Sequence, residues 1–323
     1  MTSPFVRGAR SFVLPVDKPV GPTSHDVVAW ARRALGTRAI GHAGTLDPAA
    51  SGVLVLAIEE GTKLVPYLTL DDKEYDATIT LGAETDTLDA EGEVIERAEV
   101  PSLTRETVQS IAASFLGPSR QRAPIFSAIK RGGVPLHELA RKGEDVEAPE
   151  RDVEAFALEV RRVEGACIDV HLHVGKGYYV RSFARDLSRA LGTVGHLTSL
   201  RRTRSGSFAI GRCLDARLLH DAATAAREGR DVEAARASLT SALSDRRVSM
   251  LDALPSMPTL TLDDALERDA RHGKRLAPPG FDSMAEGASC KLVHGTTLVA
   301  IARRDGESIR VVRGFVPDHD EAP

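Results

Sequence analysis

One carboxylate, Asp47, lies in a glycine-rich stretch that directly precedes an apolar run. The stretch reads Gly-His-Ala-Gly-Thr-Leu-Asp-Pro over residues 41–48, and residues 53–58 are continuously apolar and mostly branched. Glycines let a backbone turn sharply, and Pro48 disfavours a helical conformation of Asp47. The apolar run predicts a buried strand. The sequence therefore predicts a turn that presents one carboxylate, suited to act as a nucleophile or base, at the edge of the core.

Two other interpretations of this stretch are open. An Asp followed by Pro is a common helix start, with the Asp as N-cap and the Pro in the first turn. Glycine-rich turns also bind phosphates, but no Gly-Lys-Ser/Thr follows these glycines, and Gly61-Thr62-Lys63 has the wrong order. Spacing alone favours the helix cap over a reactive carboxylate.

The stretch, with Gly52-Val53-Leu54 behind it, resembles the signature loop of the TruB family of tRNA pseudouridine-55 synthases. The Asp of that loop is the family's catalytic residue, so the resemblance implies this role for Asp47 and outweighs the helix cap. Further segments match the same family in the same order. They are residues 17–24 (Asp-Lys-Pro-Val-Gly-Pro-Thr-Ser), 73–75 (Lys-Glu-Tyr), 85–92 (Thr-Asp-Thr-Leu-Asp-Ala-Glu-Gly), 121–141, 177–181 (Gly-Tyr-Tyr-Val-Arg) and 200–202 (Leu-Arg-Arg).

The resemblance also implies roles for single side chains. Tyr75 is expected to stack on the target base and to take part in a proton transfer, and Arg181 is expected to pair with Asp47. The other residues expected to bind substrate are Lys18, His42, Arg131, Tyr179, Leu200 and Arg202. Isomerisation of uridine exchanges no electrons or groups with another molecule, so neither a cofactor nor a metal is expected.

A metal site is conceivable at His171 and His173, which share one face of an alternating segment, residues 167–174. No third ligand stands at a suitable spacing. An ordinary polar strand face is therefore the preferred interpretation.

The elements around these residues follow from their periodicity. We expect a helix over 24–35 ended by Gly36, a strand over 75–81, a helix over 103–115, a strand over 167–174, a helix over 183–191, and strands at 297–302 and 308–312. The resemblance implies an α+β fold: a mainly antiparallel sheet with flanking helices. It divides the chain into a catalytic domain (1–250), with an RNA-gripping insertion at about 120–152 and a charged helical segment at about 220–249, and a small β-rich PUA-like RNA-binding domain (251–323) with an acidic tail.

Composition favours a globular protein. The 323 residues are 42% hydrophobic and 27% charged, without an apolar run long enough to span a membrane. Three widely spaced cysteines and the lack of a secretion signal predict reduced thiols in the cytoplasm. The net charge of −4 does not indicate nucleic-acid binding. Basic clusters such as residues 201–204 and 271–275 are each more typical of a solvated face, and only the motifs give them significance.

The sequence therefore predicts a tRNA pseudouridine synthase that flips uridine-55 out of the T arm and acts through Asp47. The expected partner is the T-arm stem-loop of tRNA, with no membrane and no obligate protein partner, and the chain is expected to be a monomer. The alternative is a non-catalytic tRNA-binding or folding chaperone on the same scaffold. A small-molecule hydrolase that uses Asp47 is a further rival, but it lacks an evident His–Asp arrangement.

Overall fold

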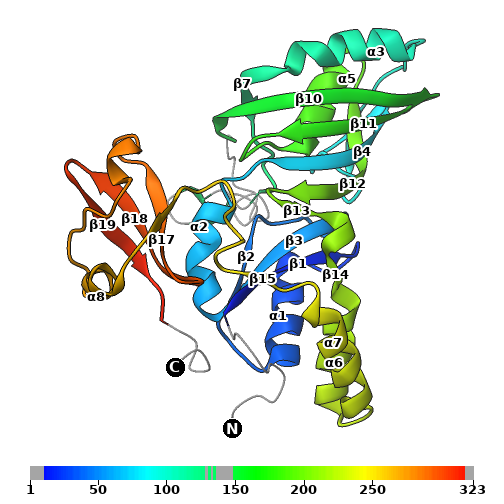
Figure 1. The fold of residues 1–323 in the computed structure, drawn as a ribbon. Coiled ribbons are helices and arrows are strands. Elements are labelled where there is room, and N and C mark those ends of the chain that lie inside the picture. The colour runs from blue at the N-terminus through cyan, green and yellow to red at the C-terminus, as the bar shows by residue number, and fades with distance from the viewer. Residues whose placement is uncertain (1–10, 128–129, 132–133, 136–147, 317–323) are drawn as a thin grey trace.

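A computed structural model describes residues 11–127, 130–131, 134–135 and 148–316 of the chain. Within these residues eleven strands form one large sheet (Figure 1), with the main order β14-β1-β3-β12-β4-β11-β10-β7. Neighbours along this order are antiparallel except for the pairs β1–β14 and β3–β12. The expected α+β fold with a mainly antiparallel sheet is confirmed.

The strands of this sheet vary in length from two residues to fifteen. They are β1 (Phe12–Lys18), β2 (Ile40–Ala43), β3 (Ala50–Ile58), β4 (Lys73–Leu81), β7 (Gly117–Arg122), β10 (Glu150–Glu164), β11 (Cys167–Val174), β12 (Gly195–Ser205), β13 (Phe208–Ala209), β14 (Leu214–Asp215) and β15 (Val248–Ser249). Two short hairpins stand apart from it: β5 (Ala83–Thr85) with β6 (Val94–Arg97), and β8 (Lys130–Arg131) with β9 (Val134–Pro135).

Helices cover one face of the large sheet. They are α1 (Ser24–Leu35), α3 (Arg105–Ala112), α5 (Val180–Ala190), α6 (Ala216–Glu228) and α7 (Val232–Ser244), with the 3-10 turn η2 (Ala113–Phe115); the 3-10 turn η3 (Ile210–Arg212) packs on the other face. Their apolar residues join those of the sheet in one core, in which Val27 of α1 and Phe183 of α5 pack with Leu54 and Ile79. The opposite face of β1 and β3 packs on η1 (Glu59–Leu64) and α2 (Val65–Leu68).

Of the three helices predicted in this region, α1 has the expected bounds, and α5 and α3 differ from expectation. Helix α1 starts after Thr23, whose side chain forms a capping box with Asp26, and ends at Gly36 as predicted. Helix α5 starts at Val180, so Arg181 lies in its first turn. The helix expected over 103–115 is α3 followed by η2.

No helix follows Asp47-Pro48. The chain turns there and enters β3, so the interpretation of Asp47 as a helix cap is wrong. The sequence around Asp47 forms a connection between two strands of the large sheet.

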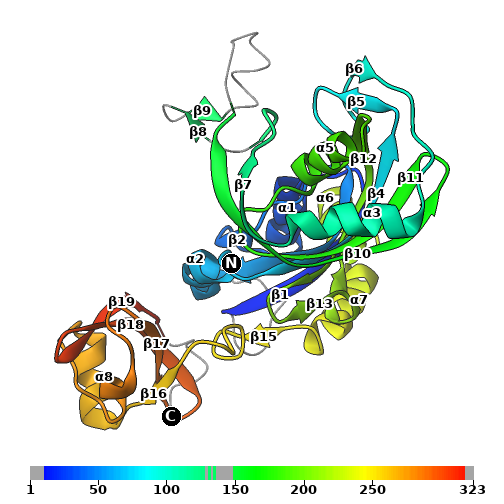
Figure 2. The same cartoon turned by 90° about the horizontal axis from the view of Figure 1, so that it is seen from above.

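The C-terminal region forms a second sheet, which Figure 2 shows to one side of the first. Its order is β16 (Thr259–Thr261), β17 (Ser289–His294), β18 (Thr297–Asp305) and β19 (Ser308–Gly314), accompanied by α8 (Asp264–Arg271) and η4 (Phe281–Ser283). It packs on the η1–α2 side of the large sheet through Phe315 and Leu298. Glu60 accepts a hydrogen bond from the Val316 N–H (2.9 Å), and Lys63 donates one to the Gly314 carbonyl (2.9 Å). The division of the chain at about residue 250 stays a prediction.

The insertion expected at about 120–152 begins in β7 and ends in β10, which pair with each other. Much of it lies outside the described residues. Arg131 belongs to β8, and its side chain is also outside the described part of the structure. None of the described helices is both long and apolar enough to cross a membrane.

Candidate active site

The loop that carries Asp47 is fixed by hydrogen bonds to its main chain. Five successive carbonyl oxygens, from Gly44 to Pro48, each accept at least one. The donors are Arg202 Nη2 to Gly44 (2.9 Å), Arg202 Nη1 to Thr45 (3.3 Å), Ser24 Oγ to Leu46 (2.9 Å), the Ala50 N–H to Asp47 (3.1 Å) and the Gly21 N–H to Pro48 (2.9 Å). The loop is therefore shaped before any substrate arrives, which is what a catalytic carboxylate requires.

Close contact between two strands explains why the loop is followed by Gly52. Strands β3 and β12 run in parallel there, with Gly52 opposite Arg202. A Cβ on Gly52 would lie 2.1 Å from the Arg202 carbonyl oxygen, and its φ of +107° is one that side chains rarely allow. This contact places Leu200, on the same strand, beside the end of the loop.

Asp47 and Arg181 form an ion pair. Arg181 Nη2 lies 2.9 Å from Asp47 Oδ2, which confirms that they are in contact. The guanidinium is buried and also donates to the carbonyls of Thr87 (2.9 Å) and Phe126 (3.0 Å), while Asp89 lies 3.5 Å from Nη1. In contrast, the Asp47 side chain is 39% exposed. Among the described residues its Oδ1 has no recorded hydrogen-bond partner.

A pocket of about 300 Å³ opens over this ion pair. Of the nine residues singled out in the sequence, it is lined by Asp47, Tyr75, Tyr179, Arg181, Leu200 and Arg202. Tyr75 lies on the central strand β4 and faces the helix-covered side of the sheet. Segments distant in sequence thus converge on one cavity.

Lys18 lies behind the loop rather than in the pocket. It is fully buried, and its amine donates to the carbonyls of Pro19 (2.9 Å), Pro22 (2.8 Å) and Pro48 (3.4 Å). Burial lowers the pKa of this amine to about 8, although the nearby carboxylate of Asp47 opposes the shift. The expected substrate contact does not fit this position, and Lys18 instead holds the loop.

Arg202 also bonds to the main chain. Its guanidinium is 1% exposed and donates to Val53 (2.6 Å) as well as to Gly44 and Thr45. It lines the pocket, but these bonds make it a residue that positions the catalytic loop. Its expected contact with substrate stays a prediction.

His42 lies on β2 and does not line the pocket. Its ring packs edge-on against His25, 5.3 Å between centroids, and its buried Nδ1 has no partner among the described residues. Burial, with smaller effects of the neighbouring His25 and Arg202, lowers its pKa to about 4. His42 is therefore neutral near pH 7, and its expected role in holding RNA stays a prediction.

Gln121 positions Tyr179. It begins the matching segment 121–141, but no role of its own was predicted for it. Its side chain accepts from the Tyr179 N–H (2.8 Å) and donates to the Tyr179 carbonyl (3.1 Å). Burial raises the pKa of the Tyr179 hydroxyl. Two more residues at the site received no role from the sequence: Asp89, although its motif was recognised, and Lys73, two positions before Tyr75 on the same face of β4.

The histidines of β11 form a polar strand face, the interpretation that the sequence favoured over a metal site. His171 bonds to Asp76 (2.7 Å), and His173 bonds to Asp72, which also pairs with Arg204 (2.8 Å). The described residues contain no group of three or more side chains that could hold a metal ion.

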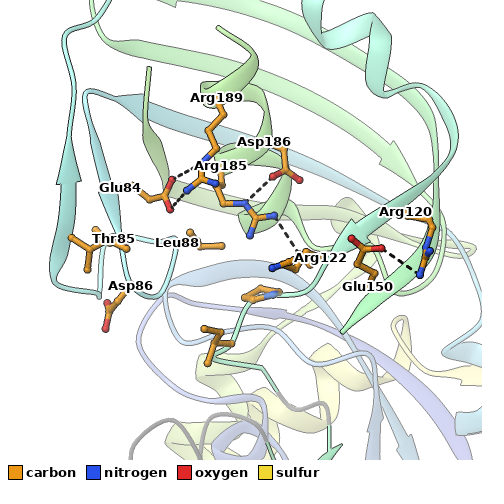
Figure 3. Close-up of a pocket in the computed structure, with 13 residues that line it drawn as sticks. Glu84, Thr85, Asp86, Leu88, Arg120, Arg122, Glu150, Arg185, Asp186 and Arg189 are labelled. Atoms are coloured by element: carbon orange, nitrogen blue, oxygen red, sulfur yellow. Dashed lines mark hydrogen bonds and ion pairs between the residues drawn. The ribbon is translucent and has the colours of Figure 1, made fainter. Parts of the chain in front are cut away.

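A second pocket, of about 480 Å³, lies along α5 beyond the catalytic one (Figure 3). Arginines line it, and carboxylates neutralise them: Arg189 pairs with Glu84 (2.9 Å) and Arg185 with Asp186 (2.7 Å). It contains none of the residues expected to act on substrate. The chemistry therefore belongs to the pocket over Asp47.

Comparison with known proteins gives consistent matches. Residues 32–180 match the model of the TruB family pseudouridylate synthase (N terminal domain), and residues 181–248 match that of the tRNA pseudouridylate synthase B C-terminal domain. The chain is 37% identical to tRNA pseudouridine synthase B of Deinococcus radiodurans, over 94% of this chain and 99% of the relative. It is 39% identical to the protein of that name from Geobacter sulfurreducens, over 92% and 91%.

Solved structures show the same fold. A chain of the crystal structure of a Cbf5-Nop10-Gar1 complex is 26% identical, with a TM-score of 0.70, over 95% of this chain and 86% of that one. A chain of an H/ACA RNP bound to a substrate RNA containing 2'-deoxyuridine is 24% identical, with a TM-score of 0.68, over 95% and 85%.

Proposed function

The chain belongs to the TruB family of pseudouridylate synthases, and from this we propose that it isomerises uridine-55 in the T arm of tRNA. Relatives named tRNA pseudouridine synthase B support tRNA as the substrate. The observation that carries the proposal is the Asp47–Arg181 ion pair at a pocket lined by Tyr75.

The target base must enter this pocket from outside. A uridine stacked in a folded tRNA loop is out of reach, so it has to be flipped, at a cost of a few kcal/mol in lost stacking and pairing. The pocket accepts one pyrimidine, with the Tyr75 ring available to stack on it. Phosphate and shape contacts outside the pocket supply the binding energy that offsets the flip.

Asp47 then starts the reaction as nucleophile or base. The bond between N1 and C1′ breaks, the uracil turns, and C5 bonds to C1′ while C5 loses its hydrogen as a proton. Arg181 keeps the carboxylate in place through Oδ2, which leaves Oδ1 for the substrate. Tyr75 is assigned the stacking and proton-transfer role, and Tyr179 and Leu200 form walls of the pocket.

The same proposal covers partners and place of action. The enzyme is proposed to act on tRNA as a monomer without an obligate protein partner. The C-terminal sheet is proposed to bind RNA outside the T arm. The cytoplasm is the proposed compartment.

Tritium release from a T-arm stem-loop labelled at C5 of uridine tests the proposal. C5 loses its hydrogen only when it becomes the glycosidic carbon, so the wild type is expected to release tritium. Asp47→Asn is expected to release none while it binds the stem-loop within about twofold of the wild type, because phosphate contacts dominate affinity. Tight RNA binding without release by the wild type contradicts the proposal and favours the chaperone alternative. Release by Asp47→Asn at the wild-type rate contradicts the assignment of Asp47.

A further inference from the structure

A second buried cation, Lys73, lines the catalytic pocket and has no role in the mechanism above. It is the first residue of β4, and the strand's alternation places it on the same face as Tyr75. Its side chain is 7% exposed. A Cβ built on Gly44, in the catalytic loop, would lie 3.9 Å from Lys73 Cε, so the aliphatic end of this side chain lies close to that loop.

The ammonium of Lys73 is only partly satisfied by the protein. It donates to the carbonyls of Thr69 (2.9 Å) and Asp71, which account for two of its three N–H groups. Among the described residues no carboxylate lies within ion-pair distance of it. Burying a cation without a counter-ion is costly, which points to a ligand that supplies negative charge.

The other cations of the site are already occupied. Lys18 donates to three carbonyls behind the loop, and Arg202 donates to three carbonyls around it. Arg181 is shared between two carboxylates and two carbonyls. Lys73 is thus the pocket cation best placed to meet a charge that develops on the substrate.

Resting on the proposed function, we infer that Lys73 stabilises the negative charge of the uracil by donating to one of its carbonyl oxygens. When the N1–C1′ bond breaks, its electron pair passes to the uracil ring and spreads over O2 and O4. Meanwhile C1′ bonds to an Asp47 oxygen, or C2′ loses a proton to that oxygen and a C1′=C2′ double bond forms. The pair is used again when C5 bonds to C1′, which releases the Asp47 oxygen or returns the proton to C2′; C5 then gives up its proton and N1 gains one. Addition of Asp47 to C6 also places a negative charge on the ring. The role of Lys73 is therefore independent of the route.

The protonation of Lys73 makes the rate of the proposed reaction depend on pH. Burial and the nearby Arg202 lower the pKa of its amine to about 8, and Asp71 and Asp72 raise it in part. Since only the ammonium carries charge, the rate of the chemical step is expected to fall as the pH rises above about 8. Lys18 has a pKa in the same range, so variants must separate the two lysines.

The test uses single-turnover rates on the T-arm stem-loop with the full chain. In Lys73→Gln the side chain keeps N–H donors at its end but carries no charge. We expect a rate about 10²-fold lower, a dissociation constant for the RNA within about twofold of the wild type, and a smaller decline in rate above pH 8 than in the wild type, since Lys18 still titrates there. The matched control is Lys291→Gln, which removes a buried, carbonyl-bonded lysine of the C-terminal sheet and is expected to leave the rate unchanged.

A substrate with a better leaving group separates a catalytic from a structural role. With 5-fluorouridine at the target position, measured as its consumption after nuclease digestion, the fluorine already stabilises the uracil anion. The ratio of the wild-type rate to the Lys73→Gln rate is then expected to be at least fivefold smaller than with uridine. Equal defects on both substrates, a wild-type rate in Lys73→Gln, or an alkaline decline in Lys73→Gln as large as that of the wild type would each overturn the inference. Failure of the wild type to release tritium would instead overturn the proposed function.

Discussion

At the scale of single residues, the charged side chains around Asp47 differ in what they bond to. Arg181 bonds to the reactive carboxylate, whereas Arg202 and Lys18 bond to the main chain that carries it. A sequence shows that three cations belong to matching motifs, but not which atoms they meet. The pairing of Asp47 with Arg181 was predictable through the family resemblance; the loop-holding bonds of Arg202 were not.

His42 makes the stability of the fold depend on pH. Its pKa is about 4 in the folded protein and near 6.5 when exposed, so between these values the unfolded chain binds a proton that the folded chain excludes. Stability is therefore complete above pH 6.5 and is lost as the pH falls towards 4. Between pH 7.5 and 5.0 we expect His42 to account for a loss of roughly 1 kcal/mol after allowance for solvent screening.

Urea unfolding of the wild type and His42→Gln at both pH values measures this contribution. The variant is expected to lose less stability on acidification than the wild type. His220→Gln, at an exposed position, serves as the control and is expected to follow the wild type. An equal loss in the wild type and His42→Gln contradicts the prediction.

At the scale of elements, the contacts of helix α5 explain why the sequence predicted its start three residues too late. Its first turn begins after Tyr179, which makes no side-chain cap. The N–H of Tyr179 bonds instead to the side chain of Gln121 on β7, 58 residues away in sequence. Local signals such as a Ser or Asp cap predict helix starts well, and a tertiary partner leaves no local signal. The strand over 167–174, whose burial alternates cleanly, was predicted to the residue.

The contact between β3 and β12 depends on the absence of a side chain at Gly52. In Gly52→Ala the new Cβ would meet the main chain of Arg202, and φ at this position is positive. We expect the free energy of unfolding to fall by about 3 kcal/mol or more, measured in urea. Gly211→Ala is the control, because nothing lies within 4 Å of a Cβ there. A Gly52→Ala protein as stable as the wild type would show that the two strands can separate at no cost.

At the scale of the whole molecule, the active site lies across the parallel junction of β3 and β12. Asp47 comes from the part of the sheet that contains β1 and β3, and Tyr75 comes from the part that contains β4. The pattern of apolar residues predicted β3 and β4, but it contains no information about which strands pair. From the sequence, only the family resemblance indicated that Asp47 and Tyr75 belong to one site.

The C-terminal sheet is expected to bind parts of tRNA beyond the T arm. Arg310 and Arg313 are exposed on β19, where they can reach phosphates. The double variant Arg310→Ala/Arg313→Ala is expected to bind whole tRNA about tenfold more weakly, with a salt dependence reduced by about two counter-ions. Its affinity for the isolated stem-loop is expected to be unchanged.

Filter binding at several salt concentrations measures both effects. Arg227→Ala/Arg230→Ala removes the same charge from the end of α6 and the turn before α7, and serves as the control. Unchanged affinity of the Arg310→Ala/Arg313→Ala variant for whole tRNA contradicts the assigned role. Deletion of the whole region is a poorer experiment, because it would uncover apolar residues of the large sheet such as Val55 and Leu64.

The hydrogen bonds to five successive carbonyls of the catalytic loop have a consequence for protein engineering. The donors Gly21, Ser24 and Arg202 lie 20 or more residues away from the atoms that they bind, on other elements. Residues 41–54 transplanted into another scaffold would carry the sequence of the loop but not its conformation. The transferable unit is therefore the whole sheet with α1, and activity cannot be grafted as a short peptide.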